Sequence, residues 1–251
     1  MSVQPGNVLA LHTVQAFDSE LCQLYSRVAE MAGLVMYQLE QALQALDEAD
    51  RALALRVLER DKKVNHYEVQ IDSGVIQALV RNSPVAGDLR SLISISKITY
   101  ELEKIGDEIA CFAKVVSVLF DPKTSDPNPQ LLTDIVKVGQ LVKVMLTKLL
   151  LAFEKSDPAQ AYLLLQCDRE CESELQEGIK HQLDWVLQDI RAIGRAMDIM
   201  QILKTLERCG EHSRNIAEYI IFMLEGVDVR HHRAKLRAEF AYESNRCSLS
   251  K

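Results

Sequence analysis

An internal repeat is the feature of this sequence that most restricts its fold. Residues 102–107 read LEKIGD, and residues 206–211, about a hundred positions later, read LERCGE. Both copies place an acidic residue, a basic residue, a glycine and a second acidic residue at the same offsets. A segment that recurs in this way predicts a chain built from two similar halves.

The composition predicts that both halves are helical. Of 251 residues, 48% are apolar and 6% are aromatic, and only 10 are glycine and 6 are proline. Leu, Ala, Glu, Gln and Lys are abundant, and these residues favour helices. The net charge of −7 argues against non-specific binding to nucleic acid. We therefore expect an all-α protein with no nucleic-acid partner.

Hydrophobic periodicity and helix-breaking residues divide the chain into six long antiparallel helices. Three prolines within residues 121–129 mark a linker that no helix can cross. We predict two tandem, pseudo-symmetric three-helix bundles, at residues 1–120 and 130–226, and a flexible polar tail at residues 227–251. The expected helices span about residues 16–45, 50–81, 84–119, 130–154, 158–188 and 195–224, with residues 1–10 unstructured.

Capping residues locate two of the helix ends. Ser83 is expected to be the N-cap of the third helix, with Pro84 at its first helical position. Gly226 is expected to stop the last helix.

Targeting segments are not evident in the sequence. The N-terminus has neither the basic nor the apolar stretch of a signal peptide. No uninterrupted apolar run reaches about 18 residues, the length that a membrane-spanning helix needs. We therefore expect a cytoplasmic protein that is not inserted into a membrane.

The paired acids of the first repeat predict a site. Glu103 and Asp107 are four residues apart, so on a helix they lie on one face and repel each other. On a helical wheel this face carries small residues and no base. A neighbouring stripe alternates in sign, and we expect it to be solvent-exposed and salt-bridged. That stripe consists of Lys97, Glu101, Lys104 and Glu108.

The acid pair needs a source of positive charge, because buried carboxylates without a counter-charge are very costly. A metal ion would provide that charge, and oxygen-only ligands suit hard cations. A salt bridge from another helix would serve equally well, and the wheel does not decide between the two.

Acids at the same spacing recur elsewhere in the chain. Glu207 and Glu211 form the second-repeat pair, but they share a face with Lys204, which could neutralise one of them. A polar stripe in the second predicted helix, which taken alone is more typical of a solvent face, consists of Asp61, Asn65, Glu68 and Asp72. Asp168 and Glu172 echo this stripe in the fifth predicted helix.

Several motifs together resemble the PhoU family of phosphate-signalling proteins over nearly the whole chain. The family's first signature stands here at residues 84–90 (PVAGDLR) and 102–107, and its second at residues 206–212 (LERCGEH) and 215–218 (NIAE). Residues 17–21 (FDSEL) are similar to the family's opening, and residues 222–231 are similar to its proteobacterial ending.

The resemblance implies multinuclear metal clusters on the surface of two tandem three-helix bundles. The implied ligands are Glu103, Asp107, Glu207 and Glu211, supported by Glu68 and Asp72, with Asp168 and Glu172 in the same role in the second half. Glu211 stands where the family commonly has Asp, which leaves the geometry of that cluster open. Iron, zinc, manganese and magnesium all accept carboxylate ligands, so the sequence does not name the metal.

The resemblance also implies a regulatory role and not an enzymatic one. Family members act as negative regulators of phosphate uptake and of the phosphate-starvation response. They couple the high-affinity phosphate ABC transporter, through its ATPase, to a sensor histidine kinase. Homodimers are common in the family, and membrane association is peripheral, made through these partners.

Three other functions are alternatives to this interpretation. A carboxylate-bridged di-metal oxidoreductase uses Glu-x-x-His pairs, and the sequence contains no such pair. A structural helical adaptor, whose acid pairs are salt-bridged or solvated and bind no functional metal, stays open. A hydrolase would need a nucleophile triad or a phosphate-binding loop, and neither signature is found.

Overall fold

The computed structural model describes residues 5–120, 129–188, 190 and 193–230, and the side chains of residues 17–120, 132–165, 171–188, 190 and 193–230. The described chain forms six long α-helices, so the predicted all-α class is confirmed. The helices are α1 (Pro5–Asp47), α2 (Arg51–Asn82), α3 (Ala86–Leu119), α4 (Pro129–Glu154), α5 (Pro158–Gln188) and α6 (Ile193–Glu225).

Most predicted boundaries agree with the structure within a few residues, except at the N-terminus. Helix α1 begins at Pro5, so the prediction that residues 1–10 are unstructured is wrong for residues 5–10. Residues 121–128 of the predicted linker and residues 231–251 of the predicted tail lie outside the described residues.

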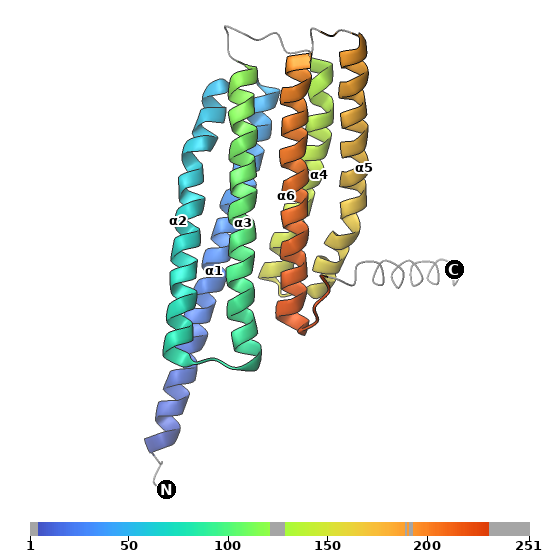
Figure 1. Ribbon diagram of the computed structural model, residues 1–251. Coiled ribbons are helices and arrows are strands. Elements are labelled where there is room, and N and C mark those ends of the chain that lie inside the picture. Colours follow the sequence, from blue (N-terminus) through green and yellow to red (C-terminus); the bar gives the residue numbers. More distant parts are fainter. Residues whose placement is uncertain (1–4, 121–128, 189, 191–192, 231–251) are drawn as a thin grey trace, which may run out of the picture.

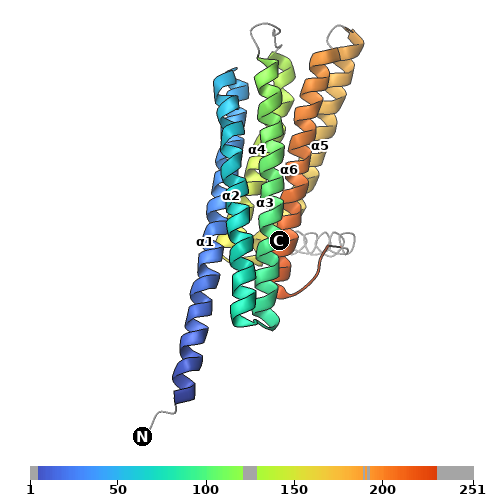
Figure 2. The ribbon, with the colours of Figure 1, turned by 60° about the vertical axis from the view of Figure 1, so that its left-hand side comes forward.

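The six helices lie side by side in two groups of three (Figures 1 and 2). Helices α1, α2 and α3 pack against one another, and so do α4, α5 and α6. The two groups meet through α3 against α6, the most extensive contact between any two helices, and through α1 against α4. Helices α3 and α6 run antiparallel: Arg90, near the start of α3, donates a hydrogen bond to the carbonyl of Met223, near the end of α6.

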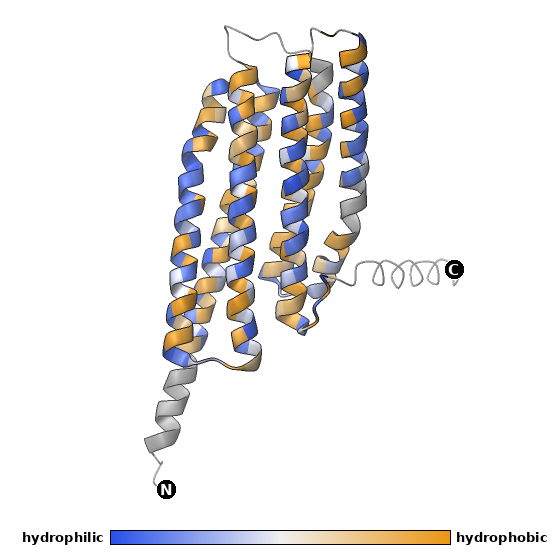
Figure 3. Ribbon diagram, in the orientation of Figure 1, coloured by the Kyte–Doolittle hydropathy of each residue, from blue (hydrophilic) through white to orange (hydrophobic). Residues whose placement is uncertain are grey.

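Apolar side chains from all six helices form a continuous core. Leu39, Phe112 and Ile202 are each fully buried within it. Hydrophobic and hydrophilic residues interleave along every helix (Figure 3), as expected when one stripe of each helix faces the core. Burial of each large apolar side chain contributes about 1.5–3 kcal/mol to the stability of the fold. The packed core therefore fixes the helices, and the helices hold the polar residues described below in place.

The turn between α2 and α3 differs from the prediction. Ser83 is the C-cap of α2 and not the N-cap of α3: its backbone is left-handed, with φ 44°, and its N–H donates to the carbonyl of Leu79. Val85 occupies the N-cap position of α3 without a side-chain cap hydrogen bond, and Pro84 precedes the helix. The reason is that a residue in the left-handed conformation commonly terminates a helix, and here Ser83 terminates α2.

The end of α6 agrees with the prediction. Gly226 has φ +75°, a conformation that glycine adopts without strain, and its N–H donates to the carbonyl of Phe222 at 2.9 Å. Among the described residues, no helix is both long and apolar enough to cross a membrane.

Candidate functional site

Five carboxylates gather where α2 packs against α3. They form what we call the acidic face, which consists of Asp61, Glu68 and Asp72 of α2 and Glu103 and Asp107 of α3. The two helices are adjacent and antiparallel, and their register is fixed by a hydrogen bond of 2.8 Å from Ser96 Oγ to Asp72 Oδ1. The structure therefore brings together the four sequence-predicted acids of the first half.

Asp61 joins the acidic face because Gly106 leaves room for it. A Cβ atom placed on Gly106 would lie 3.3 Å from Asp61 Oδ1 and 3.1 Å from Val64 Cγ1. The Asp61 Oδ1 atom is buried and has no hydrogen-bond partner. The sequence placed Asp61 in the polar stripe of α2 but did not assign it to the site. The signal that could have found it is the small residue between the two acids of the repeat.

Burial and nearby negative charge raise the pKa values of two of these acids, Asp61 and Glu68. Burial and then repulsion from Asp107 and Glu103 raise the pKa of Asp61 from 3.8 to about 6. The pKa of Glu68 is raised by burial first and then by repulsion, mainly from Glu103 and Asp72. Burial and repulsion thus both disfavour the charged forms of Asp61 and Glu68, a situation common at functional sites.

One prediction about this face is wrong: the acid pair of α3 does have a base. Lys104 Nζ lies 2.8 Å from Glu103 Oε2 and 3.3 Å from Asp107 Oδ2. The wheel placed Lys104 away from the pair, but a long side chain can bend back across its own helix. The two carboxylates raise the pKa of Lys104. Its contact with Glu103 Oε2 is an ion pair without hydrogen-bond geometry, since that buried oxygen has no hydrogen-bond partner.

The acidic face has suitable ligands for a hard metal ion, although they are not yet arranged around one position. Carboxylate oxygens are the ligands that such ions prefer. The buried Asp61 Oδ1 has no hydrogen-bond partner, whereas the buried Glu103 Oε2 is paired with Lys104. Among the side chains that the structure describes, no three acidic, His or Cys groups converge on one point. Binding would therefore require the carboxylates to reorient and Lys104 to move aside.

The second-half acids are more dispersed. Lys204 Nζ lies 3.8 Å from Glu207 Oε2, so the predicted neutralisation of one acid of this pair is confirmed. Glu211 on α6 and Glu172 on α5 are exposed. The side chain of Asp168 lies outside the described residues. The metal assignment for these four residues thus stays a prediction.

The alternating stripe of α3 is not the exposed surface that the sequence predicted. Glu101 is only 7% exposed. It faces α6, where its Oε2 accepts hydrogen bonds from His212 Nδ1 at 2.7 Å and Asn215 Nδ2 at 3.2 Å. Glu108 pairs with Arg208 of α6 at 3.0 Å. The wheel found the stripe correctly, but a single helix does not reveal that the second half of the chain packs on it.

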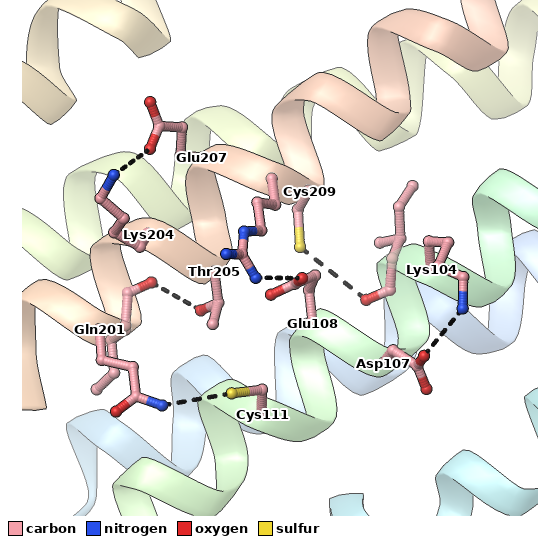
Figure 4. Close-up of polar contacts among 12 residues, drawn as sticks. Lys104, Asp107, Glu108, Cys111, Gln201, Lys204, Thr205, Glu207 and Cys209 are labelled. Carbon is pink, nitrogen blue, oxygen red and sulfur yellow. Dashed lines mark hydrogen bonds and ion pairs between the residues drawn. The ribbon is translucent and has the colours of Figure 1, made fainter.

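The polar seam between α3 and α6 follows the repeat. Figure 4 shows Cys209 of α6 against the α3 backbone, Glu108 of α3 near this contact, and Cys111 farther along α3, where it accepts a hydrogen bond from Gln201 of α6. Cys209 Sγ lies 4.0 Å from the carbonyl oxygen of Ile105, and these two residues occupy the same position in the two copies of the repeat. Because the antiparallel helices meet at equivalent residues, the two halves are related by an approximate two-fold axis.

Comparison with known proteins identifies both halves. The family model described as "PhoU domain" matches twice, at residues 28–116 and at residues 135–220. A phosphate-specific transport system accessory protein PhoU homolog of Pseudomonas aeruginosa is 37% identical over 223 residues, which cover 89% of this chain and 91% of that protein. The accessory protein PhoU of Escherichia coli K12 is 31% identical over 220 residues, with 88% and 90% covered.

Two solved structures have the same fold. The crystal structure of PhoU from Pseudomonas aeruginosa superposes with a TM-score of 0.78 at 35% identity, covering 84% of this chain and all (100%) of that one. The regulatory protein PhoU from Streptococcus pneumoniae gives a TM-score of 0.76 at 26% identity, with 85% and 99% covered. Two matches to one domain, spread over most of a duplicated helical chain, establish that this protein belongs to the PhoU family.

Proposed function

We propose that this protein is a negative regulator of phosphate uptake and of the phosphate-starvation response. The observation that carries the proposal is the family membership of both halves. Relatives that align with nearly nine-tenths of the chain are named as accessory proteins of the phosphate-specific transport system.

The proposed regulator acts through contacts with other proteins and not by catalysis. Its partners are the ATPase of the phosphate ABC transporter and a sensor histidine kinase, which it holds inactive when phosphate is plentiful. It works in the cytoplasm, at the membrane only through these partners, and forms a homodimer. The rigid, continuous helical core supports such a role, because it presents long side-by-side helices as docking surfaces.

Metal binding at the acidic face is the second part of the proposal. Glu68, Asp72, Glu103 and Asp107 would hold an iron, manganese, zinc or magnesium ion, joined by Asp61, whose buried oxygen lacks a hydrogen-bond partner. In the second half the corresponding ligands would be Glu207, Glu211, Asp168 and Glu172. Bound metal would supply positive charge and coordination positions that accept phosphate oxygens. Once the repulsion among these carboxylates was removed, α2 and α3 would pack more closely.

A structural adaptor without functional metal is the alternative that one observation favours. Lys104 already contacts both acids of the α3 pair, at 2.8 and 3.3 Å. In that case Lys104 provides the counter-charge permanently, and the regulatory role is carried by protein surfaces alone.

The regulatory role can be tested in the cell of origin. The gene is deleted, and a reporter of the phosphate-starvation response is measured in excess phosphate. We expect the reporter to be switched on in the deletion strain and repressed again when this chain is restored. A reporter that stays repressed without the gene would contradict the proposal.

The partners can be tested with the purified chain. Pull-downs against the sensor kinase and the transporter ATPase are expected to recover both proteins without a chelator and less of each protein when a chelator is present. Recovery that survives chelation would favour the adaptor without metal, and recovery of neither protein would contradict the proposed coupling.

A further inference from the structure

The described chain ends at the seam between α3 and α6, across the outward side of α3 from the acidic face. The guanidinium of Arg230, the last described residue, lies 5.8 Å from the ring centre of Tyr219 on α6. The same ring receives Lys97 of α3, whose Nζ is 5.1 Å from the ring centre. Val229 is buried, with 3% exposed. The chain is therefore anchored against α3 and α6 at the level of Lys97 before the remaining residues, 231–251, begin.

The acidic face lies within a short reach of that point. Glu103 is six residues beyond Lys97 on α3, which corresponds to about 9 Å along the helix. The outward side of α3 between them carries Tyr100, which is 53% exposed. An extended chain spans about 3.3 Å per residue, so the first few residues after Arg230 can reach the carboxylates.

Residues 231–251 have the composition that complements this face. They contain five basic residues, Arg233, Lys235, Arg237, Arg246 and Lys251, and only two acidic ones, Glu239 and Glu243. Three of the five basic residues lie within the first seven positions after Arg230. The segment also contains the large apolar residues Leu236 and Phe240.

The face combines uncompensated negative charge with exposed apolar side chains. Lys104 contacts only Glu103 and Asp107 among five carboxylates. Next to these carboxylates, the outward sides of α2 and α3 carry large apolar residues that are 40% to 65% exposed: Val69, Ile76, Ile93 and Tyr100. Charge and apolar contact thus favour the same occupant, a short basic segment with apolar anchors.

We propose that residues 231–251 of this chain dock on its own acidic face, with Arg233, Lys235 and Arg237 at the carboxylates and Leu236 and Phe240 against the apolar residues beside them. The segment is tethered to the molecule by a short stretch of chain, so closing the contact costs less entropy than binding a separate peptide. The inference goes beyond the proposed regulatory role and does not require metal. It makes the tail a competitor of any cation that uses the same carboxylates.

Zero-length cross-linking of the full-length chain tests the contact. A carbodiimide joins a lysine amine to a carboxylate that it touches, and mass spectrometry identifies the pair. We expect Lys235 to be joined to Glu68, Asp72, Glu103 or Asp107. The yield should fall between 50 mM and 500 mM salt, because exposed charge pairs are screened. A mixture of ¹⁴N- and ¹⁵N-labelled chains should give products within single chains only.

Matched substitutions make the test specific. E68Q, D72N and E103Q together should lower the yield of the remaining cross-link, between Lys235 and Asp107, about three- to 160-fold, if each of the three removed pairs contributes about 0.2–1 kcal/mol. The control E48Q, E154Q and E177Q, which changes three exposed acids outside the face, should leave the yield unchanged.

Three results would overturn the proposal: Lys235 joined mainly to other acids, equal loss of yield in the control variant, or cross-links between labelled and unlabelled chains. Metal content is measured on the same samples. A protein that binds no metal but still forms the cross-link would refute the metal part of the proposed function and leave the docked tail standing.

Discussion

At the scale of the residue, Asp61 shows how a charged carboxylate on the acidic face lowers the stability of the fold. Its pKa is raised from 3.8 to about 6 by burial and by Asp107 and Glu103. The folded state therefore binds more protons than the unfolded state between about pH 4 and 6, and the stability of the fold decreases as the pH rises through that window. Above it, the charged carboxylate opposes folding.

Replacing Asp61 with Asn should consequently stabilise the protein. We expect D61N to raise the free energy of unfolding by about 1 kcal/mol at pH 7, a value discounted because the side chain is only half-buried. The gain should largely disappear at pH 4. Urea titrations at both pH values measure this effect, with D184N, an exposed acid of α5, as the control. A loss of stability at pH 7 would contradict the electrostatic interpretation.

Lys104 is the residue that stands between the acidic face and a metal ion. Its Nζ lies 2.8 Å from Glu103 Oε2, so bound metal must displace it. We expect K104Q to tighten Mn²⁺ binding about fivefold, since removal of one nearby positive charge contributes about 1 kcal/mol. Isothermal titration of the wild type and the variant tests this. Weaker binding by K104Q would mean that Lys104 helps to organise the site.

The glycines of the two repeats offer a matched pair of substitutions. A Cβ on Gly106 would lie 3.1 Å from Val64 Cγ1 and 3.3 Å from Asp61 Oδ1, whereas on Gly210 its nearest neighbours are at 3.9 Å. Alanine should stabilise either helix by about 0.5–1 kcal/mol through its helix propensity. We expect that gain in G210A but not in G106A, where the crowding removes it. Thermal unfolding measures both, and equal gains would contradict the close packing of Asp61 on Gly106.

At the scale of the element, the seam between α3 and α6 holds the two halves together with buried polar contacts. Glu101 depends on His212 and Asn215 for its hydrogen bonds. Loss of one partner of a buried charged group costs about 1–3 kcal/mol. We therefore expect H212A to lower the free energy of unfolding by that amount, as measured by urea titration.

Arg208 provides the comparison within the same seam. It pairs with Glu108 at 3.0 Å, but its own side chain is 60% exposed. Exposed ion pairs contribute only about 0–1 kcal/mol, so R208A should have a clearly smaller effect than H212A. Equal effects of the two substitutions would show that burial of Glu101 does not govern the seam.

The sequence predicts the helices of this protein better than the contacts between them. Periodicity and helix breakers located six helices, because each of these signals acts within one segment. Contacts between side chains could not be predicted in the same way. A helical wheel describes one helix, so it cannot show that α6 covers Glu101, and it ignores side-chain length, so it cannot show that Lys104 bends toward Glu103. The prediction that Ser83 caps α3 was wrong for a related reason: a residue between two helices can cap either one, and Ser83 caps α2.

At the scale of the whole molecule, duplication has produced two halves with unequal acid sites. The first half gathers five carboxylates on one face, with the Asp61 oxygen buried beside Gly106. In the second half Glu207 is already beside Lys204, and Glu211 and Glu172 are exposed. If the carboxylates hold metal, we expect the first half to bind it more tightly than the second.

Metal content is the measurement that bears most directly on the proposed site. The chain is dialysed to equilibrium against Mn²⁺ or Fe²⁺, and bound metal is measured by elemental analysis. The wild type is compared with the variant E103Q/D107N/E207Q/E211Q, and with a control, E48Q/E154Q/E177Q/D184N, that changes four exposed acids elsewhere. We predict that the wild type and the control retain metal and that the first variant loses it. Unchanged stoichiometry in that variant, or no metal in the wild type, would contradict the proposed metal site.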